Sequence, residues 1–180
     1  SICLANSYLH SQERVQSSSV VNSAQNVALE VTLEIPRLNV SEYHRPYIAV
    51  WVEDKSNKLV QHLAVWYQQD TNEEGHGAKW LPDLRQWWRR GGRELKMPVD
   101  GISGATRTVG KHSIKVAAKQ LEALQPGNYT IVVEASREVG GREVVELPLK
   151  WPALKIAESH ATGETELGDV ALKVFPAPQS

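Results

Sequence analysis

Apolar and polar residues alternate along positions 27–35, which is the pattern of a β-strand with one buried and one solvated face. Pro36 ends this segment, because proline cannot extend a hydrogen-bonded ladder. Residues 47–54 are apolar on both faces and therefore predict a more central strand. Similar apolar runs between turn residues predict five further strands, at residues 58–68, 110–118, 129–138, 142–151 and 169–175.

One helical signal interrupts the strands, at residues 80–90. Proline at position 82 suits a first helical turn, a pair of arginines suits the last turn, and a pair of glycines follows as a stop. Spacings of three and four residues would place four large side chains on one face: Trp80, Leu84, Trp87 and Trp88. Seven strands with short turns and one short helix predict an all-β fold, an antiparallel immunoglobulin-like β-sandwich.

Composition narrows the class of protein. A hydrophobic fraction of 41% and a charged fraction of 23% are typical of a soluble globular chain, and we expect a single domain at residues 26–180. Residues 1–25 are rich in Ser, Gln and Asn, which predicts a flexible lead-in after a removed signal peptide. The net charge of −1 gives no basic surface, so nucleic acid is not an expected partner. Cys3 is the only cysteine, which excludes an internal disulfide and a Cys-x-x-Cys motif.

Motifs of metal binding and of hydrolysis are missing from the sequence. The six histidines form no H-x-H, H-x-x-H or HExxH spacing, so no metal site is predicted. Ser103 lies outside any G-x-S-x-G motif, which leaves hydrolase chemistry without support. We therefore expect neither a metal ligand set nor a catalytic residue in this chain.

The most specific string in the chain is DGISGAT, at residues 100–106. Its Asp, Ser and Gly residues predict an exposed turn, and its small side chains leave the hydroxyl of Thr106 open to another molecule. Average residue usage gives the pattern D-G-x-[S/T]-G-A-T a chance frequency of roughly one in 10⁴ to 10⁵ chains of this length. An ordinary turn between two strands is the alternative interpretation.

The heptapeptide resembles the flavinylation motif of extracytosolic flavoproteins, such as subunits of the sodium-translocating NADH:quinone reductase and of Rnf-type complexes. In those proteins a dedicated FMN transferase splits FAD and joins FMN through its phosphate to the last threonine. The resemblance implies a covalent FMN on Thr106, with such a periplasmic FMN transferase as a partner. It also implies a recognition sequence of five residues: Asp100, Gly101, Ser103, Gly104 and Ala105.

Longer strings spread over residues 27–175 resemble domain-of-unknown-function family 2271, a family of predicted periplasmic proteins. Among them are YHRPYIAVWVED, KWLPDLRQWW and PGNYTIVVEASREVGG. Because members of that family occur with a periplasmic FMN transferase and with PepSY-type membrane proteins, the resemblance implies a periplasmic redox role. A PepSY-type or quinone-linked membrane protein is the implied redox partner. The family often has histidine where this chain has Val139, so any role of that histidine in the family is not expected in this chain.

Several residues near the heptapeptide are candidates for contact with a flavin. An indole face suits a flat ring, and three tryptophans precede the motif: Trp80, Trp87 and Trp88. Arg107 and His112 follow the acceptor and are candidates to bind the phosphate. The alternatives are core or lid aromatics and solvated loop charges. Two other tryptophans lie on predicted strands and are expected in the core: Trp51 and Trp66.

The expected function is that of a periplasmic flavoprotein electron-transfer domain, a redox carrier rather than a stand-alone enzyme. The alternative is a structural or ligand-binding β-sandwich that has no cofactor and grips a glycan or a partner protein with exposed tryptophans. That alternative is motivated by the six Trp, against five Tyr and one Phe. A stand-alone flavin reductase would need a substrate pocket and an acid–base pair, which the sequence does not reveal. No oligomeric state is predicted.

Overall fold

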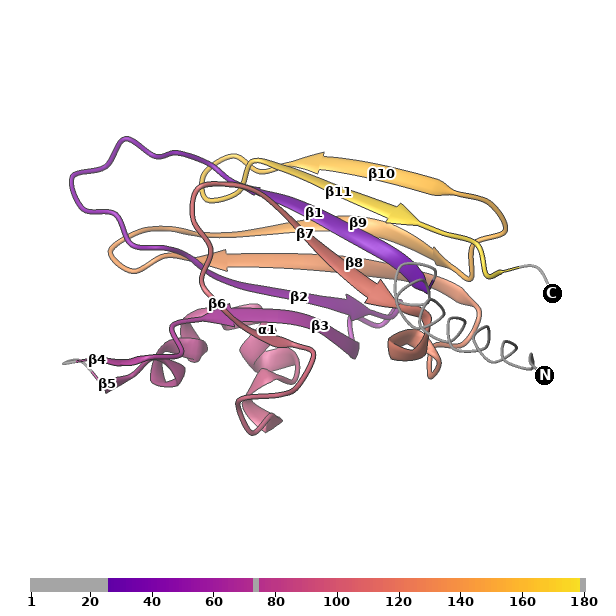
Figure 1. The fold of residues 1–180 in the computed structure, drawn as a ribbon, viewed down its shortest axis with the longest axis horizontal. Coiled ribbons are helices and arrows are strands. Elements are labelled where there is room, and N and C mark those ends of the chain that lie inside the picture. Colours follow the sequence, from indigo (N-terminus) through magenta and orange to yellow (C-terminus); the bar gives the residue numbers. More distant parts are fainter. Residues whose placement is uncertain (1–25, 73–74, 179–180) are drawn as a thin grey trace, which may run out of the picture.

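Two β-sheets pack face to face (Figure 1). The computed structural model describes residues 26–72 and 75–178, so the lead-in expected at residues 1–25 lies outside the described residues. The four-stranded sheet has the order β10 (Ala157–Thr162), β11 (Asp169–Val174), β1 (Val27–Ile35) and β7 (Gly110–Ala117). The five-stranded sheet has the order β6 (Ser103–Ala105), β3 (Leu59–Tyr67), β2 (Tyr47–Glu53), β8 (Gly127–Ser136) and β9 (Arg142–Trp151).

The all-β sandwich expected from the sequence is confirmed, and all seven predicted strands occur close to their predicted bounds. Neighbouring strands are antiparallel, except that β6 pairs with β3 in parallel. β10 was not predicted, because its residues are mostly exposed and carry no apolar alternation. Nor were β6 and the two-residue strands β4 (Thr71–Asn72) and β5 (Gly75–His76).

The main core lies between the two sheets. The alternating residues of β1 point into it, and Leu29, Val31 and Leu33 have no exposed surface. β2 is apolar on both faces because it has a core on each side. Its inner residues, such as Val50, join the main core, while Trp51 points outward into a second apolar cluster. The alternating pattern of β1 therefore indicates a strand that is covered on one face, and the continuous apolar run of β2 indicates a strand that is covered on both faces.

The second cluster lies between the five-stranded sheet and the helical segment that covers its outer face (Figure 1). That segment comprises the 3-10 helix η1 (Gly77–Asp83), α1 (Arg85–Arg90) and the 3-10 helix η2 (Gly92–Glu94), and a further 3-10 helix, η3 (Ala118–Leu121), follows β7. The α-helix is thus shorter than the predicted span of residues 80–90. Leu84 and Trp87 face the sheet as expected, but Trp80 lies in η1 with 44% of its surface exposed.

A buried glutamate of β8 fixes the start of α1. Leu84 stands at the N-cap of this helix and supplies no side-chain hydrogen bond. The carboxylate of Glu134 instead accepts the backbone N–H groups of Gln86 at 3.0 Å and of Trp87 at 2.7 Å. The Nε of Arg142 donates to the same carboxylate at 2.6 Å, which compensates its burial. A six-residue helix therefore gains from the sheet the cap that its own sequence lacks.

A second glutamate holds the loop between β10 and β11. The carboxylate of Glu143, on β9, accepts the backbone N–H groups of four consecutive residues, 164–167. Burial opposes ionisation of this carboxyl, but the four N–H donors outweigh it and hold the pKa of Glu143 below its ordinary value of 4.5. The ionised carboxylate therefore joins β9 of one sheet to the β10–β11 loop of the other.

We expect this anchor to make the protein less stable in acid. The pKa of Glu143 is lower in the folded chain than in the unfolded chain. Its contribution to stability is therefore complete when the pH is above the unfolded pKa, and it is lost as the pH falls through the folded pKa. Glu143→Gln should therefore flatten the acid side of a plot of unfolding free energy against pH. Urea unfolding between about pH 7 and pH 3 would measure it. Glu146→Gln, exposed on the same strand, is the control, and identical slopes for wild type and Glu143→Gln would contradict the prediction.

Candidate functional site

The heptapeptide of residues 100–106 begins as a tight turn that its own serine closes. The backbone N–H groups of Ile102 and Ser103 donate to the carbonyl of Val99, at 3.2 and 2.9 Å. In return the Ser103 hydroxyl accepts the N–H of Val99 at 2.8 Å. Gly101 adopts a φ of +74°, a conformation that glycine takes without strain. Ser103 is thus a structural residue of the turn.

The centre of the heptapeptide is an edge strand, where the sequence predicted an exposed loop. The N–H of Val65 donates to the carbonyl of Ile102 at 2.9 Å, and β6 then pairs with the end of β3. Ser103, Gly104 and Ala105 lie opposite residues 65–67 in that register. The run of small residues explains the difference, since it can lie flat against a bulky strand. The motif is therefore held on the sheet up to the residue before Thr106.

Gly104 passes directly against the indole of Trp66. A Cβ at this position would stand 3.0 Å from Cδ1 of Trp66, closer than almost any side chain tolerates. Trp66 itself is only 5% exposed and belongs to the main core. The glycine therefore allows β6 to lie close against β3, and a larger residue would require the indole or the strand to shift by a few tenths of an ångström.

Thr106 lies where the chain leaves one sheet for the other. β6 is the edge of the five-stranded sheet and β7 is the edge of the four-stranded sheet, so residues 106–109 cross between the layers (Figure 1). The Thr106 side chain is partly exposed, and its hydroxyl has no hydrogen-bond partner among the described residues. The preceding strand fixes its position while leaving its oxygen free.

Arg107 and His112 gather beside this crossing, around Trp66. The guanidinium of Arg107 lies 4.8 Å from the centre of the Trp66 ring, and its Nη1 donates to the carbonyl of Ala105 at 2.8 Å. The imidazole of His112 meets the same indole edge-on, at 6.0 Å between centroids, and its Nε2 donates to the carbonyl of Thr108 at 2.7 Å. Both expected phosphate-binding candidates are therefore near Thr106. Trp66 lies in the core as predicted, but its contacts with Arg107 and His112 were not predicted.

The three tryptophans predicted near the flavin do not gather at Thr106. Trp87 has no exposed surface, and its Nε1 donates to Nδ1 of His62 at 3.0 Å. Burial lowers the pKa of His62, which favours the neutral imidazole that this bond requires. Trp88 is partly buried against Trp87, and Trp80 is exposed with the ammonium of Lys79 over its ring. Trp87 is therefore a core residue with no face available to a ligand.

A cavity of about 300 Å³ lies on the other side of the motif. Its walls come from the end of β3 and from the turn of the heptapeptide: Tyr67, Gln69, Pro98, Val99, Asp100, Gly101 and Ser103. Tyr67 is 1% exposed, and its side chain belongs to the second apolar cluster rather than to the core that holds Trp66. The heptapeptide thus borders two different environments. On one side Arg107 covers Trp66, and on the other side lies the cavity beside Tyr67.

Within the described part of the chain, no three His, Cys, Asp or Glu residues are placed to hold a metal ion, and no helix is long and apolar enough to cross a membrane. Comparison with protein families gives one finding: the model of a family described as "Predicted periplasmic protein (DUF2271)" matches residues 28–169. No curated protein and no solved structure shows a significant match.

Proposed function

This chain belongs to the DUF2271 family of predicted periplasmic proteins, and on that premise we propose that it is a periplasmic electron-transfer domain carrying covalent FMN on Thr106. The observation that carries the proposal is the partly exposed, unpaired hydroxyl of Thr106 at the end of a strand made by its own motif. A free hydroxyl at a fixed position is what a modifying enzyme needs in a substrate protein.

The attachment is a transfer from FAD. The Thr106 oxygen forms a bond to the phosphorus on the FMN side of the pyrophosphate, the bond to the AMP phosphate breaks, and AMP leaves. The hydroxyl proton passes to a base of the transferase. Gly104 and Ala105 leave the approach to the Thr106 oxygen unobstructed, because neither carries more than a methyl group. The chain itself contributes no catalytic residue to this step.

The residues around Thr106 suit a bound phosphodiester, which keeps one negative charge. Arg107 follows the acceptor directly and offers guanidinium N–H groups beyond the one that binds Ala105. His112, on the strand β7, already donates its Nε2 proton to the carbonyl of Thr108 and would have to exchange that partner to bind the phosphate. When bound, FMN would supply one- or two-electron chemistry, while the chain supplies attachment and orientation. The electron donor that we propose is a PepSY-type or quinone-linked membrane protein.

Production of the protein with a periplasmic FMN transferase tests this function. We expect yellow protein whose intact mass exceeds that of the unmodified chain by one FMN minus one water. Protein made with an inactive transferase is the matched control and should keep the unmodified mass. Colourless protein of unchanged mass in both samples would contradict the proposal.

That negative result would favour the other class of function, binding of a glycan or a partner protein. The observation on its side is Trp80, which is 44% exposed and has a lysine ammonium at its ring. Trp80→Ala would then abolish glycan binding in an array or by calorimetry. The same substitution should leave FMN attachment unchanged if the flavoprotein proposal holds, since Trp80 lies in η1 and outside the heptapeptide.

A further inference from the structure

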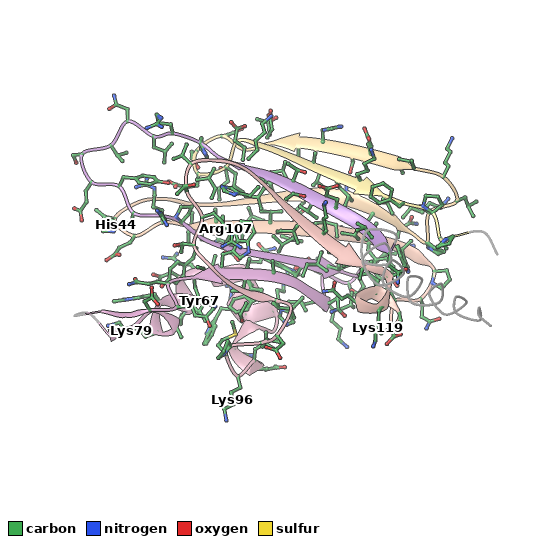
Figure 2. The ribbon with its side chains drawn as sticks, viewed as in Figure 1. His44, Tyr67, Lys79, Lys96, Arg107 and Lys119 are labelled. Carbon is green, nitrogen blue, oxygen red and sulfur yellow. The ribbon has the colours of Figure 1, made fainter. Side chains whose placement is uncertain are left out.

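The register of β6 on β3 separates the surroundings of Thr106 into two faces. Side-by-side residues in paired strands point to the same face, so Gly104 shares a face with Trp66 and Ala105 shares the opposite face with Tyr67. The first face is filled, because the guanidinium of Arg107 covers the indole of Trp66. The second face opens into the cavity of about 300 Å³. Figure 2 shows Arg107 on the side of the four-stranded sheet and Tyr67 on the side of α1.

Tyr67 contributes an aromatic ring and a phenol hydroxyl to this cavity. No hydrogen bond of its hydroxyl occurs among the described residues. Although the residue is only 1% exposed, the hydroxyl is not one of the fully buried atoms that lack a partner, so it keeps some contact with solvent. Its neighbour Tyr47, edge-on at 6.4 Å, shows the usual arrangement, since its hydroxyl donates to the carbonyl of Gly77 at 2.9 Å. The hydroxyl of Tyr67 is therefore available to a ligand.

The walls of the cavity carry two kinds of chemistry. Pro98 and Val99 present apolar surface, whereas Gln69 and Asp100 bring an amide and a carboxylate. An isoalloxazine ring has the same division, with a dimethylbenzene end and a pyrimidine end that bears an imide N–H between two carbonyls. The volume is at the lower end of the range for small-molecule sites, which suits one flat ring whose phosphate end stays outside.

We propose that this cavity holds the isoalloxazine ring of the FMN on Thr106, with Tyr67 as its aromatic neighbour and as a hydrogen-bond partner of its polar end. This inference rests on the proposed function. Tyr67 thereby takes the place of the expected tryptophans as the ring contact, because Trp87 is buried and neither Trp80 nor Trp88 lines the cavity. Tyr67 lies outside the heptapeptide, so its replacement leaves the sequence that the transferase recognises unchanged.

Flavin fluorescence of the modified protein tests the inference. Phenols quench an excited flavin by donating an electron, whereas the benzene ring of phenylalanine does not. Tyr67→Phe should therefore raise the fluorescence per bound flavin several-fold and shift the visible absorption bands, with the full mass gain retained. Tyr47→Phe is the matched control, because it makes the same change in the adjacent ring that does not line the cavity. Its fluorescence should equal that of the wild type.

The outcomes separate the two proposals. Full mass gain with unchanged fluorescence and absorption in Tyr67→Phe would overturn the ring site and leave the attachment on Thr106 standing. An increase found only in Trp80→Phe would also overturn it and would place the ring at η1. Absence of any mass gain in the wild type would contradict the proposed function itself.

Discussion

Replacing Thr106 by valine is expected to abolish covalent FMN attachment completely. Valine has nearly the same shape as threonine but no hydroxyl, so no phosphoester bond can form. The hydroxyl of Thr106 has no hydrogen-bond partner among the described residues, so its loss should change the unfolding free energy by well under about 1 kcal/mol. The intact mass after production with the transferase, compared with the thermal midpoint of the same sample, would show both effects.

Thr108→Val is the matched control for that experiment. Thr108 is an exposed threonine on the same crossing segment, two residues beyond the acceptor and outside the heptapeptide. This variant should carry as much FMN as the wild type. Retained attachment in Thr106→Val, or loss of it in Thr108→Val alone, would move the acceptor away from Thr106 and would contradict the proposal.

Replacing Glu166 by alanine is expected to lower the stability of the fold strongly. Its carboxylate receives Nε of Arg137 at 2.9 Å, Nη2 at 3.1 Å and the N–H of Gly141 at 3.0 Å. Both side chains are nearly inaccessible, with 6% and 5% exposed, and the hydrogen bond to Glu166 raises the pKa of Arg137. Glu166→Ala leaves a buried charge without its partner, which costs about 3–5 kcal/mol. Urea unfolding would measure this loss.

The double variant Arg137→Leu with Glu166→Leu shows whether the lost charge pairing is the cause. Two apolar residues of similar size fill the space and leave no buried charge, so the double variant should be markedly more stable than Glu166→Ala alone. A double variant as unstable as the single one would contradict this account. In that case the hydrogen bond to Gly141, which both variants lose, would be the main contribution of Glu166.

The strands could be predicted because burial follows the alternation of apolar residues. In β1 every second side chain reaches the main core, and in β2 both faces are covered, so each pattern has one physical meaning. β10 could not be found in this way. It is an edge strand whose Ala157–Thr162 segment is held by backbone hydrogen bonds to β11 rather than by burial of its side chains. Backbone pairing leaves no trace in composition.

The buried face of the helix could be predicted, but its first residue could not, for a similar reason. Local spacing identified Leu84 and Trp87 as residues that face the sheet. The true start of α1 depends on Glu134, which is 47 residues away from Trp87 in the chain and caps the helix from β8. No local pattern contains that contact, so the predicted helix began too early, at Trp80.

The position of the acceptor was predictable from its motif, whereas its surroundings were not. The small residues before Thr106 indicate a segment that other groups approach closely, and the contact of Gly104 with Trp66 has that character. The pairing of β6 with β3 decides which aromatic residues flank the motif, and strand register is a long-range property. Trp66 and Tyr67 are adjacent in sequence and point to opposite faces because strand residues alternate, and the register then places one beside Gly104 and the other beside Ala105.

The parallel pairing of β6 with β3 is also expected to limit self-association of the protein. Without β6, the end of β3 around Val65 would present unpaired backbone N–H and C=O groups, and such edges recruit strands from other molecules. The segment that carries Thr106 covers this edge with three small residues and then turns away into the other sheet. Substitutions that loosen β6 should therefore promote self-association as well as misplace Thr106.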